Sequence, residues 1–284
     1  MRQNGVMSET ITQLGSPRLL SDQQLTTWQA DGFHVERSLF SRWEVDQVAE
    51  RFNALAERAE PVEGHWEPDP AGTDVLARYP RVMQPHEFDP ASFQLFLDRR
   101  VESVLQQLLG EDVVGCQTMF YFKPPGARGQ AFHQDNYYLR VQPATCVAAW
   151  LAVDRSHPRN GGLQVCPGTH TMDLECPEHA DLSTSFVDDF VAPPVGHEPV
   201  ALELEPGDML FFTGSVVHGS DPNSTADEWR RSFISHYMPK SATHIGKWYL
   251  PHLYDFDGHP VSKDSNDWGG PCGEEDPSIR QSFH

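Results

Sequence analysis

One stretch near the middle of the chain decides how the sequence is interpreted: Ala131-Phe132-His133-Gln134-Asp135-Asn136-Tyr137-Tyr138. Side chains two residues apart in a β-strand point to the same face, so we expect His133 and Asp135 to share one face. One residue offers an imidazole nitrogen and the other a carboxylate oxygen. A His-x-Asp tripeptide alone is weak evidence for a metal site, because the chain has 14 histidines and such tripeptides arise by chance.

A second segment strengthens the metal hypothesis. Residues 205–212 read as a turn that leads into an apolar strand, and His218 follows at the start of the next turn. Two histidines and one carboxylate form a facial triad that suits Fe(II) and leaves positions open for an organic co-substrate and O2. His133, Asp135 and His218 are therefore the predicted metal ligands and the predicted catalytic centre.

An arginine downstream of His218 adds a candidate anchor for a co-substrate. Arg230 comes just before a predicted strand over 231–238, and a fixed guanidinium there could pair bidentately with a carboxylate. Arg231 is the competing candidate, because a slip of one residue exchanges the face to which each side chain points.

The surrounding sequence predicts a mainly β core. After Gly110, short runs rich in β-forming residues are separated by Gly and Pro turns, at 113–123, 131–141, 146–153, 162–166, 200–204, 208–212 and 231–238. Strands at this spacing without long helices are typical of a barrel or a double-sheet jelly roll. Residues 171–197 form a longer connection, which we interpret as a functional insertion or lid.

Helix signals come before this core. Ser21 with Gln24 and Ser41 with Glu44 each fit a capping box, and Gly32 ends the first helix. Asp89 begins a third helical stretch, which Gly110 ends, and the Pro- and Gly-rich segment 61–73 is a predicted loop.

We therefore expect a single oxygenase domain over 1–284. In it, residues 1–18 are mobile, 19–110 form a helical flank and 111–238 form the core with its insertion at 171–197. Residues 239–284 form a tail that covers the mouth of the barrel as a lid or packs on a second subunit.

Composition narrows the range of partners. The net charge of −20 disfavours binding to nucleic acid or to an anionic membrane, and no apolar run is long enough to span a bilayer. Five cysteines at irregular spacing, with no signal peptide, favour buried or free thiols in a reducing cytoplasm. We expect a cytoplasmic monomer or homodimer that acts on a small molecule.

Several ordered motifs resemble the phytanoyl-CoA dioxygenase family, which includes ectoine hydroxylase. The match runs from about Leu25 to Met238. The motifs that carry it are Ala30-Asp31-Gly32-Phe33, Leu39-Phe40-Ser41, Phe122-Lys123-Pro124, Phe132-His133-Gln134-Asp135, Asn160-Gly161-Gly162-Leu163, Pro167-Gly168-Thr169-His170, Pro206-Gly207-Asp208 and His218-Gly219-Ser220 with Asn223.

The resemblance implies a double-stranded β-helix (a cupin-like jelly roll) with N-terminal helices packed outside, and an enzyme that uses Fe(II), 2-oxoglutarate and O2. It favours Arg230 over Arg231 as the anchor of 2-oxoglutarate. It also assigns Ser220, Tyr121 and Trp150 to the co-substrate pocket and Gln117 to the substrate side. Tyr137 is a further candidate for the substrate pocket.

The resemblance implies hydroxylation of an unactivated carbon in a metabolite or natural product. Related halogenases replace the carboxylate ligand by Gly or Ala, so Asp135 argues against halogenation. Desaturation, epoxidation, cyclisation and epimerisation stay open, as does the identity of the substrate. Two alternatives are a cupin-like metal enzyme that does not use 2-oxoglutarate and a metal-dependent binding protein without turnover.

Overall fold

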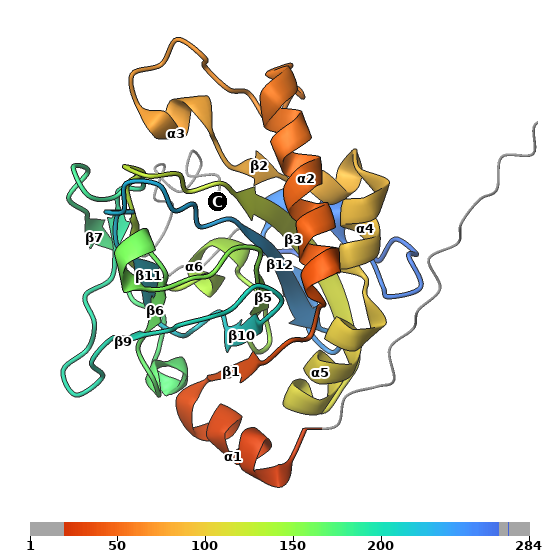
Figure 1. Cartoon of the computed structure of the whole chain (residues 1–284). Helices are drawn as coiled ribbons and strands as arrows, with labels where there is room; N and C mark the ends of the chain where they lie inside the picture. The colour runs from red at the N-terminus through yellow and green to blue at the C-terminus, as the bar shows by residue number, and fades with distance from the viewer. Residues whose placement is uncertain (1–19, 267–271, 273–284) are drawn as a thin grey trace, which may run out of the picture.

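Two antiparallel sheets form the centre of the protein. The computed structural model describes residues 20–266 and residue 272. The larger sheet has the order β1-β10-β5-β12-β3-β2, with bounds Phe33–Glu36, Met209–Thr213, Val147–Ala152, Ser232–Pro239, Val113–Tyr121 and Val82–Met83. The smaller sheet has the order β4-β11-β6-β9, with bounds Gln130–His133, His218–Ser220, Leu163–Val165 and Val200–Ala201 (Figure 1). This arrangement is consistent with the predicted jelly roll.

Side chains along the strands of the larger sheet point alternately into two apolar layers, one on each face. Trp150 of β5, Leu210 of β10 and Ile234 of β12 pack on the inner side with residues of β6. Their strand neighbours Leu151 and Phe233 belong to a second cluster, which also contains residues of the helices. Because successive side chains of a strand point to opposite faces, both faces of this sheet are buried.

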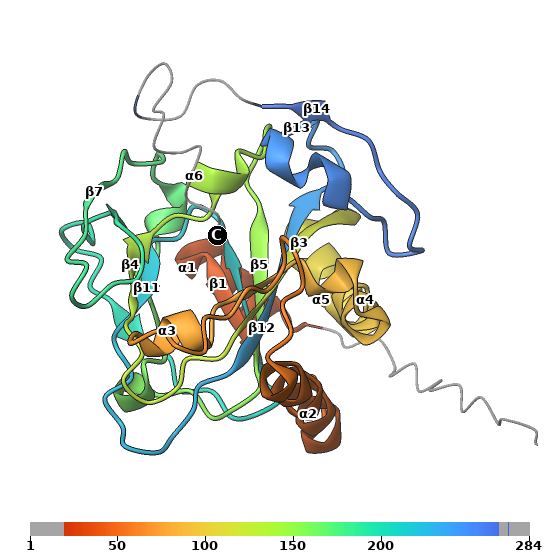
Figure 2. The same cartoon turned by 90° about the horizontal axis from the view of Figure 1, so that it is seen from above.

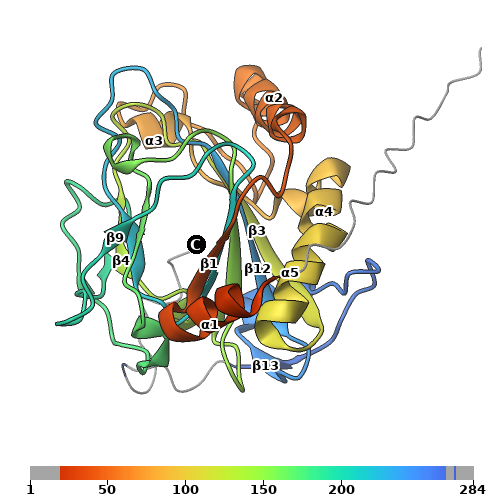
Figure 3. The same ribbon diagram turned by 60° about the horizontal axis from the view of Figure 1, so that its bottom comes forward.

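Helices line the outer side of the larger sheet. Three of them, α2 Arg42–Arg58, α4 Pro90–Phe96 and α5 Arg99–Leu109, contribute buried residues to the apolar cluster behind this sheet. Helix α1 Asp22–Asp31 packs beside β1, and the short α3 Val75–Arg78 lies on the side of the smaller sheet (Figure 2). Figure 3 shows α4 and α5 beside β3 and β12, across from β4 and β9. The ring of Phe52 in α2 stacks on Phe120 in β3, with 3.8 Å between ring centroids, so α2 is fixed to the sheet by direct aromatic contact.

The local helix signals hold in the structure. Ser21 and Ser41 both cap helices through complete capping boxes, and Gly32 ends α1 in the left-handed conformation. The third stretch differs from the single helix that we predicted, because the chain breaks at Leu97 and Asp98. The Asp98 side chain accepts a hydrogen bond from the Arg100 backbone and begins a separate helix, α5.

Three predictions about strands need correction, and both edge strands of the larger sheet were not predicted. The predicted strand 131–141 ends at His133, and residues Asn136–Leu139 form the short helix α6 instead. His218 begins strand β11 and does not lie in a turn, and the predicted strand 200–204 is reduced to Val200–Ala201. Strands β1 and β2 were not predicted, although β1 pairs with β10 at one edge of the larger sheet.

The insertion and the tail both pack against the core. Within the insertion, β7 Glu178–His179 pairs with β8 Asp189–Phe190, and the backbone N–H of Val191 donates to Phe132 of β4. In the tail, β13 His244–Ile245 pairs with β14 Asp264–Ser265. Figure 2 shows these two strands on the same side of the molecule as α6. Tail residues Tyr249 and Leu253 are buried in a cluster with Tyr138 of α6.

Short 3-10 turns complete the described structure: η1 Pro85–Glu87, η2 Pro158–Asn160, η3 Thr169–Thr171 and η4 Lys247–His252. Within residues 20–266, no helix combines the length and the apolar character needed to cross a membrane. The prediction that residues 1–18 are mobile lies outside the described residues.

The expectation of free thiols is wrong for two of the five cysteines. Cys176 of the insertion and Cys272 of the tail form a disulfide across 96 residues of sequence, whereas Cys116, Cys146 and Cys166 are free and buried. Two cysteines so far apart carry no spacing signal, so only the fold could reveal the pair.

Candidate metal centre

The two histidines of the predicted triad face each other across the smaller sheet. Strand β11 pairs with β4 so that His218 lies directly opposite His133. Side chains opposite each other in an antiparallel pair emerge on one face. The two imidazole rings are accordingly 4.2 Å apart between centroids, and both are buried.

Both imidazoles are held in the same orientation by their own strands. The Nδ1 atom of His133 lies 2.8 Å from the carbonyl oxygen of Ala131, and Nδ1 of His218 lies 3.0 Å from that of Val216. A carbonyl only accepts, so each Nδ1 carries the proton and each Nε2 keeps a lone pair. This is the tautomer that binds a metal through Nε2.

Asp135 reaches the same point from a turn and not from a strand. Its backbone is helical, because the chain turns into α6 directly after His133. Asn136 fixes this turn, since its N–H donates to Gly214 and its side chain accepts from Val141. The Asp135 Oδ1 atom lies 3.4 Å from Nε2 of His133 and 3.5 Å from Nε2 of His218.

Electrostatics favour the ionisation states that a cation needs. Burial raises the pKa of Asp135, but the neighbouring His218 and His236 hold it well below its usual 3.8. Burial lowers the pKa of His218 to about 4, more than Asp135 raises it. At neutral pH the centre therefore presents an anionic carboxylate and a neutral imidazole lone pair.

These three residues suit a divalent transition metal. One ligand atom from each lies within 4.8 Å of the others, and all three residues are buried. Two imidazoles and one carboxylate on one side of an ion match the donor set that Fe(II) oxygenases use, with further positions open.

Two buried basic side chains, Arg230 and Lys123, lie close together beside the cavity that these three ligands line, and both line a pocket that adjoins it. Arg230 also lines the cavity of the ligands, with its guanidinium carbon 5.4 Å from the centre of the Trp150 ring. Lys123 donates to the carbonyl of Gly161 and to Oγ of Ser220, at 2.8 Å and 2.9 Å. Arg230 donates to the same Gly161 carbonyl and to Ser232.

Within the described residues, every hydrogen-bond partner of Lys123 and Arg230 is a neutral oxygen. Burial, and then the charge of Arg230, lowers the pKa of Lys123 well below its usual 10.5. Burial also lowers the pKa of Arg230 to about 10. Neither side chain hydrogen-bonds to a carboxylate, and the charges of Asp221 and Asp154 offset the effect of burial only in part. This region therefore favours an anionic ligand.

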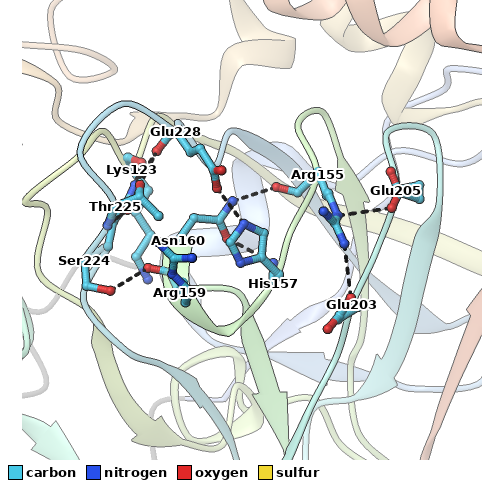
Figure 4. Close-up of polar contacts among 11 residues, drawn as sticks. Lys123, Arg155, His157, Arg159, Asn160, Glu203, Glu205, Ser224, Thr225 and Glu228 are labelled. Carbon is cyan, nitrogen blue, oxygen red and sulfur yellow. Dashed lines mark hydrogen bonds and ion pairs between the residues drawn. The ribbon is translucent and has the colours of Figure 1, made fainter.

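The Gly161 carbonyl that both cations contact belongs to a braced loop (Figure 4). Asn160 donates to the backbone of Arg155, and His157 pairs with Glu228 at 2.6 Å. Arg155 also pairs with Glu203 and Glu205 on the neighbouring segment. These contacts brace the loop that carries Gly161 from the surface of the protein.

The remaining predicted site residues divide into two groups. Ser220, Tyr121, Trp150 and Gln117 all line the cavity that contains the three candidate ligands. Tyr137 does not line it; its hydroxyl lies 3.4 Å from Sγ of Cys272, within the cluster formed with the tail. The prediction that Tyr137 lines the substrate pocket is therefore wrong. Residues 136–139 form the helix α6 and not a strand, and this helix directs the neighbouring Tyr138 toward the cavity.

Arg230 and Arg231 face opposite sides of the wall. Arg231 donates to both carboxylate oxygens of Asp154, each at 2.8 Å, and also contacts Asn53. Only Arg230 is directed into the cavity, as expected for adjacent residues at the start of a strand.

Sequence reasoning missed three residues at this site. Lys123 was noted only as part of a motif, and His236 was not among the candidates, although its Nε2 lies 3.1 Å from Oδ2 of Asp135. Gln130 lies 3.0 Å from Nε2 of His133 through its amide nitrogen. Alternation along β12 could have indicated His236, because Ile234 and His236 lie on the same face as Arg230.

Known proteins match this chain over most of its length. The profile of the phytanoyl-CoA dioxygenase (PhyH) family matches residues 28–232. "Phytanoyl-CoA dioxygenase 1" of Oryza sativa subsp. japonica is 27% identical over 238 residues, which cover 72% of this chain and 84% of that protein. "Methylphosphonate hydroxylase" of Gimesia maris is 28% identical over 222 residues, 76% of this chain and 80% of that protein.

Solved structures with a similar fold come from several enzymes. The carbocyclase SnoK from nogalamycin biosynthesis superposes with a TM-score of 0.67 at 21% identity and covers 88% of this chain and 98% of its own. EctD from S. alaskensis with bound Fe superposes with a TM-score of 0.65 at 22% identity, covering 87% of each chain. The epimerase SnoN, solved with Fe3+, alpha ketoglutarate and nogalamycin RO, gives 0.64 at 21% identity and covers 88% of this chain and 96% of its own.

Proposed function

Because the chain belongs to the phytanoyl-CoA dioxygenase family, whose members are non-haem iron enzymes that use 2-oxoglutarate, we propose that His133, Asp135 and His218 hold its ferrous ion. We propose further that the enzyme hydroxylates, or otherwise oxidises, an unactivated carbon of a small metabolite or natural product. Fold similarity to an epimerase and a carbocyclase keeps outcomes other than hydroxylation open.

One observation carries the proposal. Nε2 of His133 and Nε2 of His218 both lie within 3.5 Å of the same Asp135 oxygen. The protonated Nδ1 atoms leave these nitrogens as acceptors, so three electron-pair donors face one point inside the cavity. Such a cluster is stabilised by a cation at that point.

The pair Arg230 and Lys123 supports the use of 2-oxoglutarate. We infer that Arg230 and Lys123 bind the C5 carboxylate, with Ser220 as a hydroxyl partner. Trp150 and Tyr121 then form walls that keep the co-substrate in line with the metal. A cupin-like enzyme that does not use 2-oxoglutarate has no such need for two buried basic side chains beside its metal cavity, so the pair favours 2-oxoglutarate as co-substrate.

Iron and 2-oxoglutarate, when bound, supply the oxidising chemistry, and the chain supplies position and exclusion of water. The Asp135 carboxylate keeps the position that chloride occupies in halogenases, which favours oxygen transfer. In this proposal Gln117 and Tyr138, which line the cavity, face the substrate. The hydroxyl of Tyr138 donates to Asp189 of the insertion at 2.7 Å, so the insertion is in place to act as a lid.

The wider assignments are proposals too. We propose one oxygenase domain over 1–284, in which the N-terminal helices support a double-stranded β-helix from outside and the tail from 239 covers one end. We also propose a cytoplasmic monomer or homodimer.

The activity test is succinate formation and O2 consumption by the full chain with Fe(II), 2-oxoglutarate and a panel of metabolites. His218→Ala should abolish both signals, whereas the control His179→Ala should not, because His179 is exposed on the insertion. Succinate formation that persists in His218→Ala would overturn the assignment. Metal binding without succinate across the panel would favour a binding protein.

A further inference from the structure

A second cluster of metal-ligand side chains lies outside the cavity. It consists of His86, Glu87 and His252, and one ligand atom of each lies within 4.8 Å of the others. Oε1 of Glu87 is 3.1 Å from Nε2 of His86 and 2.9 Å from Nδ1 of His252. We propose that these three residues bind a divalent transition metal ion of the zinc type, which clamps the tail to the helical layer.

The orientation of His86 is the main support. Its Nδ1 lies 2.6 Å from Oγ1 of Thr118, and this oxygen can accept the Nδ1 proton and so fix the ring, as outer partners do for metal-binding histidines. Its Nε2 is buried and has no hydrogen-bond partner, although the Glu87 carboxylate is nearby. A proton on Nε2 would thus lack an acceptor in hydrogen-bond geometry, so Nε2 keeps a lone pair aimed at the cluster.

The surroundings keep that ring neutral and fixed. The His86 ring packs 4.7 Å from Phe96 and 5.9 Å from Tyr254, measured between ring centroids. Burial, followed by the charges of His252 and His65, lowers the pKa of His86 to about 3. The neutral imidazole is the form that coordinates a metal.

The ligand set and its spacing fit zinc. Zinc takes histidine nitrogens and carboxylate oxygens at about 2.0–2.2 Å, so neighbouring ligands of a tetrahedron are roughly 3.4 Å apart. The two measured separations, 3.1 Å and 2.9 Å, need only a small outward adjustment. His252 and Glu87 are about a quarter exposed, which leaves access for the ion and for water as a fourth ligand.

The position of this cluster separates it from the iron centre. Thr118 and Gln117 are neighbours on β3, and Gln117 lines the iron cavity. Adjacent strand residues point to opposite faces, so the cluster lies behind the sheet. Glu87 and His86 belong to η1, which precedes α4, and His252 belongs to η4 of the tail. A shared ion would therefore join segments more than 160 residues apart.

The experiment uses full-length protein with a disabled iron centre. In His133→Ala/His218→Ala, we expect metal-stripped protein to bind one Zn2+ per chain and to show a raised Tm with Zn2+. Adding His252→Ala should weaken zinc binding by at least about 100-fold and remove the Tm shift, because one of three ligands is lost. Glu87→Gln should act in the same direction while keeping the shape of the side chain.

His259→Ala is the matched control, since His259 belongs to an exposed tail cluster with Asp255 and Asp257. It should leave stoichiometry and Tm shift unchanged. The proposal is overturned if the double variant binds no zinc, or if His252→Ala and Glu87→Gln bind zinc as the double variant does. Either result leaves the iron assignment untouched, because the iron centre is absent from every variant compared.

Discussion

The Nε2 atom of His236 lies 3.1 Å from Oδ2 of Asp135, the carboxylate oxygen other than the one near His133 and His218. A carboxylate only accepts, so His236 donates and fixes the rotation of the Asp135 side chain. The candidate centre therefore includes a fourth residue that positions a ligand without occupying a ligand position.

This contact predicts a positioning role for His236. His236→Ala should weaken Fe(II) or Co(II) binding by about 10–100-fold, because outer partners of ligands tune affinity by that amount. His236→Gln should recover part of the loss, since its amide N–H can reach the same oxygen. Equilibrium metal titration measures both, and equal affinities for His236→Ala and wild type would contradict the role.

Substitution of Arg230 and substitution of Arg231 should have different effects, the first on co-substrate binding and the second on stability. Arg230→Ala should raise the KM for 2-oxoglutarate by roughly 10–150-fold, which corresponds to losing a charge-assisted hydrogen bond of about 1.5–3 kcal/mol. Arg231→Ala should leave that KM near wild type but lower stability by about 1–3 kcal/mol, because Asp154 loses its partner. Succinate kinetics and urea unfolding give the two readouts. The reverse pattern would assign the co-substrate to Arg231.

The buried amine of Lys123 leads us to expect that the enzyme takes up a proton when 2-oxoglutarate binds. Burial and Arg230 hold its pKa well below 10.5 in the empty cavity, and a bound carboxylate would raise it again. Binding then takes up a proton between the shifted pKa and 10.5, so affinity falls as pH rises through that range. Calorimetry at several pH values below 10.5, each in two buffers of different ionisation enthalpy, should reveal uptake of up to about one proton. Lys123→Met should remove this uptake, and buffer-independent heats for wild type would contradict it.

The disulfide between insertion and tail predicts a thiol count. Protein purified without reductant and then denatured should show three reactive thiols of the five cysteines, and all five after reduction. Cys272→Ser should show four without reductant, because Cys176 is released, and should lose about 2–4 kcal/mol of stability. Five reactive thiols in unreduced wild type would rule the disulfide out.

Features that depend on residues close together in the sequence could be predicted, whereas features that depend on contacts between distant segments could not. The capping boxes at Ser21 and Ser41 involve residues three apart, so the sequence alone places those helix starts. The chemistry of His133, Asp135 and His218 was also visible from residue type. The strand assumed for Asp135 was wrong, because Gly214 holds the turn at Asn136 from 78 residues away.

The site residues that the sequence did not reveal also depend on contacts between distant segments. Lys123 becomes conspicuous only when the fold buries it beside Arg230, and Tyr137 exchanges its expected role with Tyr138 because α6 replaces a strand. His252 meets Glu87 from the tail, with no spacing in the sequence to indicate it. Alternation along a strand was the one local rule that could have found His236.

The most direct measurement is anomalous X-ray scattering at the iron edge from crystals grown anaerobically with Fe(II) and 2-oxoglutarate. The account predicts an iron peak about 2.0–2.2 Å from Nε2 of His133, Nε2 of His218 and a carboxylate oxygen of Asp135. It also predicts that the C5 carboxylate of 2-oxoglutarate contacts the side chains of Arg230 and Lys123. Iron bound elsewhere, with no peak between the two imidazoles and the carboxylate, would contradict it.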